Sequence, residues 1–274
     1  MIIRVASLCF VLSMMASTSL WADQAKPLKT QIPGLPMEDG HYSIKTPCVE
    51  KPIAALPGVY LGAWADTAEL CSALVVKPNA DILDIGTGNG ILAVTALERG
   101  ARFAVATDIN PRAVENARLN ARLRKLGRKL DARLVPKNRP GAFSVIKNNE
   151  RFDLIICNCP ALDAPVDSYD EANAFDPGHM LVISLFRGLK AHLKPEGKLL
   201  MTFWSGGGLD LLKKLAGENN LQLTVVETKF NKDSIPTNLR AINRRELYKI
   251  PSNKIRDTLT GQEKTLIIEI APRN

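Results

Sequence analysis

The 274-residue sequence is poor in aromatic residues, in histidine and in acidic residues. Phe, Trp and Tyr make up 5% of the chain, so a base-stacking surface for single-stranded nucleic acid is not evident. The three histidines, His41, His179 and His192, show no Ser-His-Asp order. Lys and Arg exceed Asp and Glu by 36 to 28, a formal net charge of +8 that favours acidic partners without requiring them.

Cysteine is also scarce, and its spacing disfavours a zinc site. Besides Cys9 the chain has Cys48, Cys71, Cys157 and Cys159. Cys157 and Cys159 are one residue apart, with no second Cys or His pair at a zinc-like distance, so we expect no metal. An even number of cysteines permits disulfides in an oxidising compartment but does not require them. We expect buried structural thiols.

The N-terminus lacks a hydrophobic run long enough to span a bilayer comfortably. Arg4 is followed by the apolar residues 5–16 and by a short polar stretch ending in Leu20-Trp21-Ala22, a pattern typical of a secretory signal. We expect residues 1–22 to be a signal peptide and the protein to be exported (periplasmic or secreted). After cleavage we expect no stable membrane span. The alternatives are an uncleaved anchor, or a cytoplasmic protein whose translation starts at Met14, Met15 or Met37.

Residues 23–56 have little apolar periodicity and several prolines, so we expect an irregular, proline-rich lead and one domain over 57–274. From Asp66 on, short apolar runs alternate with helical patterns. This order favours an α/β fold with a doubly wound, mostly parallel sheet, whose last strand, 265–270, could return antiparallel. The predicted strands are 81–85, 101–107, 132–135, 152–157, 198–204 and 221–230, and the predicted helices are 66–76, 91–98, 111–125, 178–193 and 209–216.

A glycine-rich loop follows the first predicted strand directly. The loop reads Gly86-Thr87-Gly88-Asn89-Gly90 and leads into an apolar helix, so its backbone can turn tightly and approach a ligand at a helix N-terminus. A dinucleotide fingerprint needs a third glycine where this chain has Ile91, which disfavours a nucleotide-dependent oxidoreductase.

The observed Gly-x-Gly-x-Gly resembles motif I of class I methyltransferases that use S-adenosylmethionine (SAM). Asp108 ends the next strand, where a carboxylate can accept both hydroxyls of a ribose. Asn110 is placed to cap the following helix, with a proline at its first turn. The resemblance implies a Rossmann-like fold with a seven-stranded sheet and SAM as cofactor. The implied cofactor-binding residues are Asp84 (at the methionine end), Gly86, Thr87, Gly88, Gly90, Asp108 and Ile109.

A second motif, Asn158-Cys159-Pro160-Ala161, follows the fourth strand of the sheet. It resembles the Asn-Pro-Pro-Tyr motif of amino-group methyltransferases, which include the release-factor glutamine enzymes. The resemblance makes Asn158 the catalytic residue and all four residues a substrate site. An amide or aromatic amine is a poor nucleophile until its hydrogens are held, and the Asn158 side-chain oxygen and Cys159 carbonyl can accept them.

The chain departs from this pattern at three places. Cys159 replaces a proline, Ala161 replaces an aromatic residue, and Ala142 stands where an acidic residue commonly contacts adenine. These departures keep a second hypothesis open, a non-catalytic SAM- or nucleoside-binding protein of the cell envelope.

Two stretches carry most of the local positive charge. Nine basic residues lie between 118 and 139, with Asp131 the single acid there, and eight lie between 229 and 256. Such density can dock phosphates, so the acceptor is left open as protein or nucleic acid. Leu119, Leu123, Leu126 and Leu130 interleave with the first stretch, however, and we favour a solvated amphipathic face there.

Overall fold

The computed structural model describes residue 35 and residues 37–160, 162–204, 208–226 and 265–273. The predicted signal peptide, Ala161 and the basic stretch 229–256 lie outside the described residues. Among the described residues, no helix is both long and apolar enough to cross a membrane.

The centre of the molecule is a seven-stranded sheet in the order β6-β5-β4-β7-β8-β10-β9. Six strands run in the same direction, and β10 alone is reversed, since it pairs antiparallel with both β8 and β9, as the sequence predicted for the last run. The strands are β4 (Asp81–Ile85), β5 (Phe103–Asp108), β6 (Leu130–Leu134), β7 (Phe152–Asn158), β8 (Leu193–Trp204), β9 (Leu221–Val226) and β10 (Thr265–Pro272).

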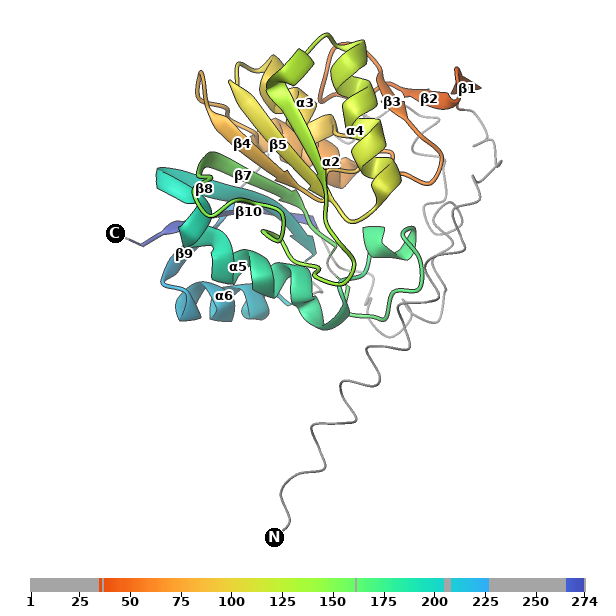
Figure 1. The fold of residues 1–274 in the computed structure, drawn as a ribbon. Helices are drawn as coiled ribbons and strands as arrows, with labels where there is room; N and C mark the ends of the chain where they lie inside the picture. The colour runs from red at the N-terminus through yellow and green to blue at the C-terminus, as the bar shows by residue number, and fades with distance from the viewer. Residues whose placement is uncertain (1–34, 36, 161, 205–207, 227–264, 274) are drawn as a thin grey trace.

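Helices cover both faces of the sheet, which confirms the doubly wound fold (Figure 1). One core joins the sheet to α2 (Ala65–Ala73), α3 (Ile91–Glu98) and α4 (Pro111–Leu123). The other joins it to α5 (Met180–His192) and α6 (Leu209–Glu218). Short 3-10 turns lie at Gly127–Lys129, Glu171–Asn173 and Pro177–His179. Strand order reverses between β4 and β7, so the carboxyl ends of these strands form the crevice in which such folds bind ligands.

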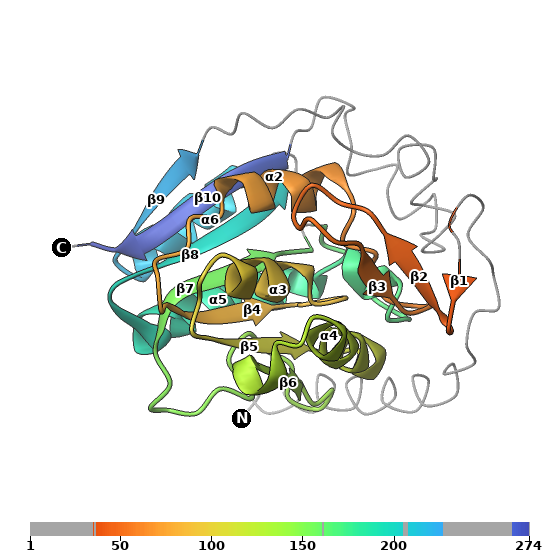
Figure 2. The same ribbon diagram turned by 90° about the horizontal axis from the view of Figure 1, so that it is seen from above.

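The lead predicted to be irregular contains a three-stranded antiparallel sheet, so that prediction was wrong for residues 37–55. The strands are β1 (Met37–Glu38), β2 (His41–Ile44) and β3 (Ile53–Ala55), and Figure 2 shows them beside α3 and α4. Pro47 and Pro52 lie between β2 and β3, where no ladder N–H is needed. Tyr42, Ile44 and Ile53 are almost fully buried in the core shared with α4.

Helix α4 packs through small and amide residues rather than through leucine. Leu123 is 56% exposed, whereas Ala113, Ala117 and Ala121 are buried. Asn116 and Asn120, one turn apart, are buried too and bond the backbone of β3: both donate to the Ala54 carbonyl, and the Ala54 N–H donates to Asn120. Asn120 also donates to the Asn89 carbonyl in the glycine loop. The prediction that Leu123 belongs to the apolar side of this helix is therefore wrong. The side of α4 that faces the protein carries Asn116 and Asn120, whose amide groups bond the edge of the N-terminal sheet.

The four described cysteines form two disulfides, which corrects the expectation of free buried thiols. Cys48 bonds Cys71 and so ties the turn between β2 and β3 to α2, across 23 residues of chain. Cys157 bonds Cys159 at the end of β7, with Asn158 between them. Both pairs have Cα atoms within the usual range for a disulfide, at 5.4 and 5.1 Å. Sequence spacing alone does not reveal such proximity for Cys48 and Cys71.

Candidate functional site

The glycine loop joins β4 to α3 and is held against the end of β5. The N–H groups of Gly86 and Thr87 both donate to the Thr107 carbonyl at 2.9 Å, and Gly88 N–H donates to an Asp108 carboxylate oxygen at 2.9 Å. Gly86, Gly88 and Gly90 all have positive φ, at 69°, 55° and 86°. The chain therefore needs glycine here for backbone reasons before any ligand is considered.

The three glycines differ in what surrounds them. A Cβ at Gly86 would meet nothing within 4 Å, and Gly86 lines the cavity described below, so its missing side chain leaves room for a ligand. A Cβ at Gly90 would meet the Ala117 Cα at 2.9 Å, because Gly90, the N-cap of α3, lies against α4. Gly90 thus serves helix packing and does not line the cavity, whereas we predicted close approach to the cofactor for all three glycines.

Asp108 lies at the end of β5 with its carboxylate directed to the loop. Its Oδ2 accepts from Gly88 N–H and its Oδ1 accepts from Asn110 N–H at 2.8 Å. The Ile109 N–H also stabilises the charged carboxylate. The lone pairs that these backbone donors do not use leave Asp108 able to accept from a hydroxyl. Burial raises the pKa of Asp108 to about 6, against the effect of these N–H donors. Next to it, Asn110 caps α4 by accepting from Arg112 N–H, as predicted.

Asp84 is fully buried and does not line the cavity. Its Oδ2 accepts from the Thr87 hydroxyl at 2.6 Å and from Ala93 N–H at 3.1 Å, which joins the loop to the first turn of α3. Its Oδ1 has no hydrogen-bond partner among the described residues. Burial raises the pKa of Asp84 to about 7. In this geometry Asp84 shapes the loop, and its direct contact with the methionine end stays a prediction.

Asn158 ends β7, beside Thr202 of β8 and facing α2. The Thr202 hydroxyl donates to the Asn158 side-chain oxygen, and the Asn158 side-chain nitrogen donates to the Thr67 hydroxyl at 3.0 Å. Both threonines are buried, at 1% and 2% exposure. We did not predict Thr202, because its relevance depends on the β7–β8 register, in which Asn158 pairs with Thr202.

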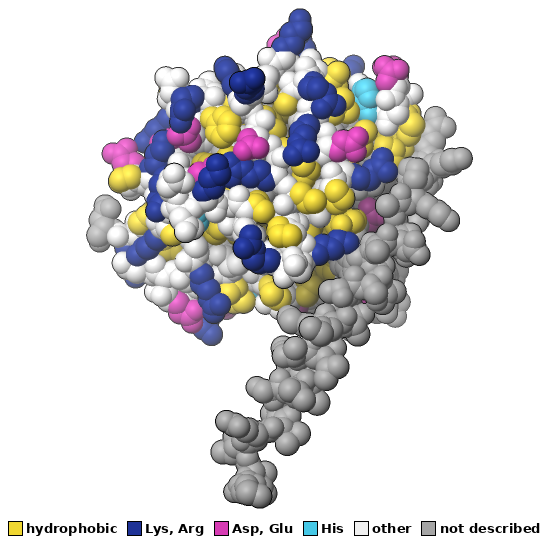
Figure 3. All heavy atoms as spheres, viewed as in Figure 1, with side chains coloured by type: hydrophobic (Ala, Val, Ile, Leu, Met, Phe, Trp, Pro, Cys, Tyr) yellow, Lys and Arg dark blue, Asp and Glu magenta, His cyan; other side chains and the backbone are white. Residues whose placement is uncertain are grey.

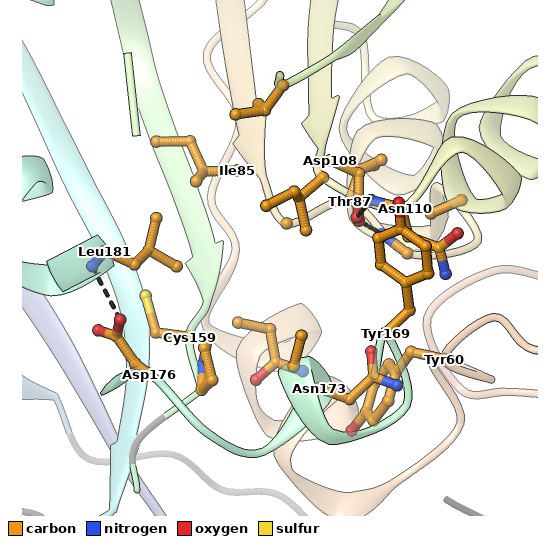
Figure 4. A pocket seen from close by; sticks show the side chains of 18 of the residues that line it. Tyr60, Ile85, Thr87, Asp108, Asn110, Cys159, Tyr169, Asn173, Asp176 and Leu181 are labelled. Atoms are coloured by element: carbon orange, nitrogen blue, oxygen red, sulfur yellow. Dashed lines mark hydrogen bonds between the residues drawn. The ribbon is translucent and has the colours of Figure 1, made fainter. Parts of the chain in front are cut away.

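One cavity of about 870 Å³ brings these groups together, a volume within the range of small-molecule sites. Figure 4 shows Thr87, Asp108 and Asn110 on one side of it and Cys159, Asp176 and Leu181 on the other. The first side is called the cofactor end and the second the acceptor end below. Of the predicted site residues, the cavity is lined by Gly86, Thr87, Gly88, Asp108, Ile109, Asn158, Cys159 and Pro160.

The connection between β7 and α5 supplies a wall that the sequence did not reveal. It folds back on itself, since Leu162 N–H donates to the Ala174 carbonyl and Asp176 N–H donates to the Leu162 carbonyl. Asp176 accepts from the N–H groups of Leu181 and Val182 at the start of α5. Its lining side chains come from a stretch without apolar periodicity: Leu162, Val166, Tyr169, Ala172, Asn173, Ala174, Phe175 and Asp176.

A cofactor with a ribose fits the groups at the cofactor end. Gly86 leaves open space, Asp108 offers acceptors at the end of β5, and Ile109 lines the cavity beside it. No Asp or Glu occurs between the end of β6 at Leu134 and Glu150. In this connection Ala142 is 1% exposed and its N–H donates to the Ser184 hydroxyl. No cluster of three or more metal-ligating side chains occurs among the described residues.

Comparison with the sequences of known proteins also points to methyltransferases. Residues 63–168 match the family model "Ribosomal protein L11 methyltransferase (PrmA)". The chain is 34% identical over 155 residues to a release factor glutamine methyltransferase of Cereibacter sphaeroides, covering 52% of this chain and 53% of the relative. It is 32% identical over 143 residues to a ribosomal protein L11 methyltransferase of Aquifex aeolicus, covering 50% of each.

The fold agrees with solved structures. A tRNA m1G37 methyltransferase of M. jannaschii superposes with a TM-score of 0.52 at 14% identity, covering 87% of this chain and 59% of that one. The chain has a class I methyltransferase fold. The predicted resemblance to SAM-dependent methyltransferases, the amino-group enzymes included, is thereby confirmed. The chain spans about half the length of the curated relatives it matches, so its own activity and substrate are taken up as proposals.

Proposed function

We propose that this chain is a SAM-dependent methyltransferase that modifies an amide or amino nitrogen of a protein. The observation that carries the proposal is the single cavity that holds both the glycine loop with Asp108 and, at the acceptor end, Asn158. The relatives named for protein substrates, release factors and ribosomal protein L11, support a protein acceptor.

The proposed roles follow from the contacts at each end. Bound SAM supplies an activated methyl group on a sulfonium, so the protein needs no metal for this chemistry. Asp108 accepts the ribose hydroxyls with the lone pairs that Gly88 and Asn110 leave open. Asn158, held by Thr67 and Thr202, uses the remaining lone pair of its amide oxygen to accept an N–H of the acceptor.

A protein acceptor is favoured over nucleic acid because much of the first basic stretch is engaged within the fold. Arg118 donates to the Ala132 carbonyl, Arg124 pairs with Glu98, and Arg133 pairs with Glu150. On the face shown in Figure 3, Lys and Arg side chains lie dispersed among acidic, polar and apolar groups. The side in view therefore offers no continuous phosphate-binding track.

We also propose that the protein acts in an oxidising compartment, as the predicted signal peptide suggests. The two disulfides support this, since cytosolic thiols are kept reduced. Fractionation of a tagged full-length protein with N-terminal sequencing tests it. Recovery outside the cytoplasm with a start after residue 22 is expected, and an uncut cytoplasmic protein would contradict it.

SAM is made in the cytoplasm, and an exported enzyme must obtain it elsewhere. This supply problem and the altered residues Cys159 and Ala142 support a second candidate function, a non-catalytic binder of SAM or a nucleoside.

Transfer of a labelled methyl group separates the candidates. Protein purified without reductant is incubated with methyl-tritiated SAM and cell extract, and label is counted in the protein and RNA fractions. We expect label in protein, lost in Asn158→Ala and kept in Asn148→Ala, an exposed control. SAM binding without transfer supports the second candidate, and label confined to RNA contradicts a protein acceptor.

A further inference from the structure

Two bonded cysteines enclose the residue proposed to hold the acceptor. Cys157 is the penultimate residue of β7 and is fully buried, and Cys159 follows the strand and lines the cavity. Their disulfide closes a small ring that contains the whole Asn158 backbone. The position of Asn158 is therefore set by a covalent constraint as well as by hydrogen bonds.

The hydrogen bonds alone fix only the end of the side chain. Thr202 and Thr67 hold the Asn158 oxygen and nitrogen from β8 and α2, on opposite ends of the amide. They do not restrict the backbone after Asn158, where the chain leaves the sheet and no ladder continues.

The chain keeps the second proline of the motif, Pro160, but lacks the first. In the motif that Asn158-Cys159-Pro160 resembles, a proline stands at position 159, and a proline ring locks φ near −65°. A cysteine at 159 restricts φ no more than other residues do. Its bond to Cys157 removes backbone conformations of the intervening Asn158. The disulfide thus restricts the backbone here, as the proline ring does in the motif.

We propose that the Cys157–Cys159 disulfide is the positioning device of the acceptor end, replacing the proline of the motif, and that its reduction loosens Asn158 and slows methyl transfer. The inference rests on the proposed function. It assigns Cys157 and Cys159 a positioning role and makes the acceptor end sensitive to a dithiol reductant, while the cofactor end stays unaffected.

The reduction step is ordinary thiol–disulfide exchange. A thiolate of the dithiol attacks Cys159 Sγ, which lies on the cavity side, and Cys157 leaves as a thiolate. The second thiol of the reductant then closes on the mixed disulfide. In total two electrons and two protons pass to the protein, which ends with two thiols, and the reductant ends as a cyclic disulfide.

The first test reads the bond itself and needs no activity. Protein purified without reductant is unfolded in denaturant, so that buried thiols can react. It is then alkylated, digested and mapped by mass spectrometry. We expect the peptide containing residues 157–159 to carry no alkyl group unless dithiothreitol is added first. Alkylated Cys157 and Cys159 in protein never exposed to reductant would overturn the proposal.

The second test asks whether a proline at position 159 restores the rate of methyl transfer that is lost without the disulfide. The variant pair is Cys157→Ala/Cys159→Ala and Cys157→Ala/Cys159→Pro, both of which keep the Cys48–Cys71 bond. With cell-extract protein as acceptor, we expect the Ala/Ala variant to transfer methyl groups about tenfold more slowly and the Ala/Pro variant to stay within about threefold of wild type. The Kd of SAM should stay within about twofold throughout.

Reductant separates the two disulfides in the same experiment. Dithiothreitol should slow wild type to the Ala/Ala rate and leave the Ala/Pro variant unchanged. A reductant effect of equal size on Ala/Pro would assign the sensitivity to Cys48–Cys71, and an Ala/Pro variant as slow as Ala/Ala would remove the proline equivalence. Either result overturns the proposal.

A third test measures the mobility of the Asn158 side chain by NMR. It needs no methyl transfer, so it tests the positioning role even if the proposed function fails. With asparagine labelled by ¹⁵N, the Asn158 side-chain NH₂ should give two sharp, slowly exchanging signals in the oxidised protein and in Ala/Pro. The same signals should broaden or exchange quickly in the reduced protein and in Ala/Ala. Identical spectra before and after reduction would contradict the positioning role.

Discussion

The cofactor end and the acceptor end of the cavity are built in different ways. At the cofactor end, the N–H groups of Gly88 and Asn110 fix the Asp108 carboxylate, the Thr107 carbonyl holds the loop, and glycines with positive φ fix the turn. At the acceptor end, side chains from β8 and α2 and a disulfide fix Asn158. The carboxylate contact at the first end joins residues 20 apart in the chain, whereas the side-chain contacts at the second reach across as many as 91 residues.

This difference explains why the glycine loop matches the methyltransferase pattern and the Asn158 motif departs from it. A glycine loop has few sequences that satisfy its backbone, so its residues are nearly prescribed. An amide side chain can be held by several combinations of neighbours, so a cysteine pair can stand where a proline is common. The departure at Cys159 is then a different solution to the same positioning problem.

The largest expected effect is at the cofactor end, where removing one carboxylate should abolish binding. Asp108→Ala removes two charge-assisted acceptors, so the Kd of SAM should rise more than about a hundredfold. Calorimetry measures it, with Asp210→Ala, a 98% exposed carboxylate on α6, as control. Full SAM affinity in Asp108→Ala would contradict the ribose-binding role of Asp108, because other residues would then have to hold the ribose.

The next effect separates glycines that face the cavity from those that pack helices. Gly90→Ala places a Cβ 2.9 Å from Ala117 Cα at φ 86°, so we expect a loss of about 2 to 4 kcal/mol in the free energy of unfolding. Gly86→Ala meets open space and should cost about 1 kcal/mol, but should weaken SAM binding. Urea unfolding and calorimetry test the pair, and equal stability losses would contradict the assignment.

At the acceptor end, loss of one hydroxyl should lower transfer without touching the cofactor. Thr202→Val leaves the Asn158 oxygen without its donor, which should slow methyl transfer about tenfold at unchanged SAM affinity. Thr95→Val is the matched control, since Thr95 is a buried threonine that bonds the Ile91 carbonyl within α3. The comparison fails if both variants lower transfer equally.

The smallest effect is a pH dependence confined to the cofactor end. The pKa of Asp108 is raised to about 6, so its carboxylate is increasingly protonated below that pH and loses acceptor capacity. The Kd of SAM should therefore be about fourfold higher at pH 5.5 than at pH 8. Asp108→Asn should reduce this dependence and leave only the part due to Asp84, the other carboxyl of the loop whose pKa is raised into this range. A Kd that falls with decreasing pH in wild type would have the wrong sign.

The strands, the helices and the glycine loop were predictable because their signals are local. Apolar runs, Asn110 with its following proline, and the Gly-x-Gly-x-Gly spacing all report on neighbouring residues. The strand register, the Cys48–Cys71 bond and the Asn116–Asn120 face depend on which segments meet in space. The four-residue spacing of the two asparagines was visible on α4, but the strand that they bond was expected to be irregular.

The most direct test of the central claim is a calorimetric titration of oxidised wild-type protein with SAM and, separately, with NAD. The glycine loop with Asp108 predicts saturable binding of SAM to one site and no measurable binding of NAD. Binding of NAD, or a folded protein that takes up no SAM, would contradict the claim.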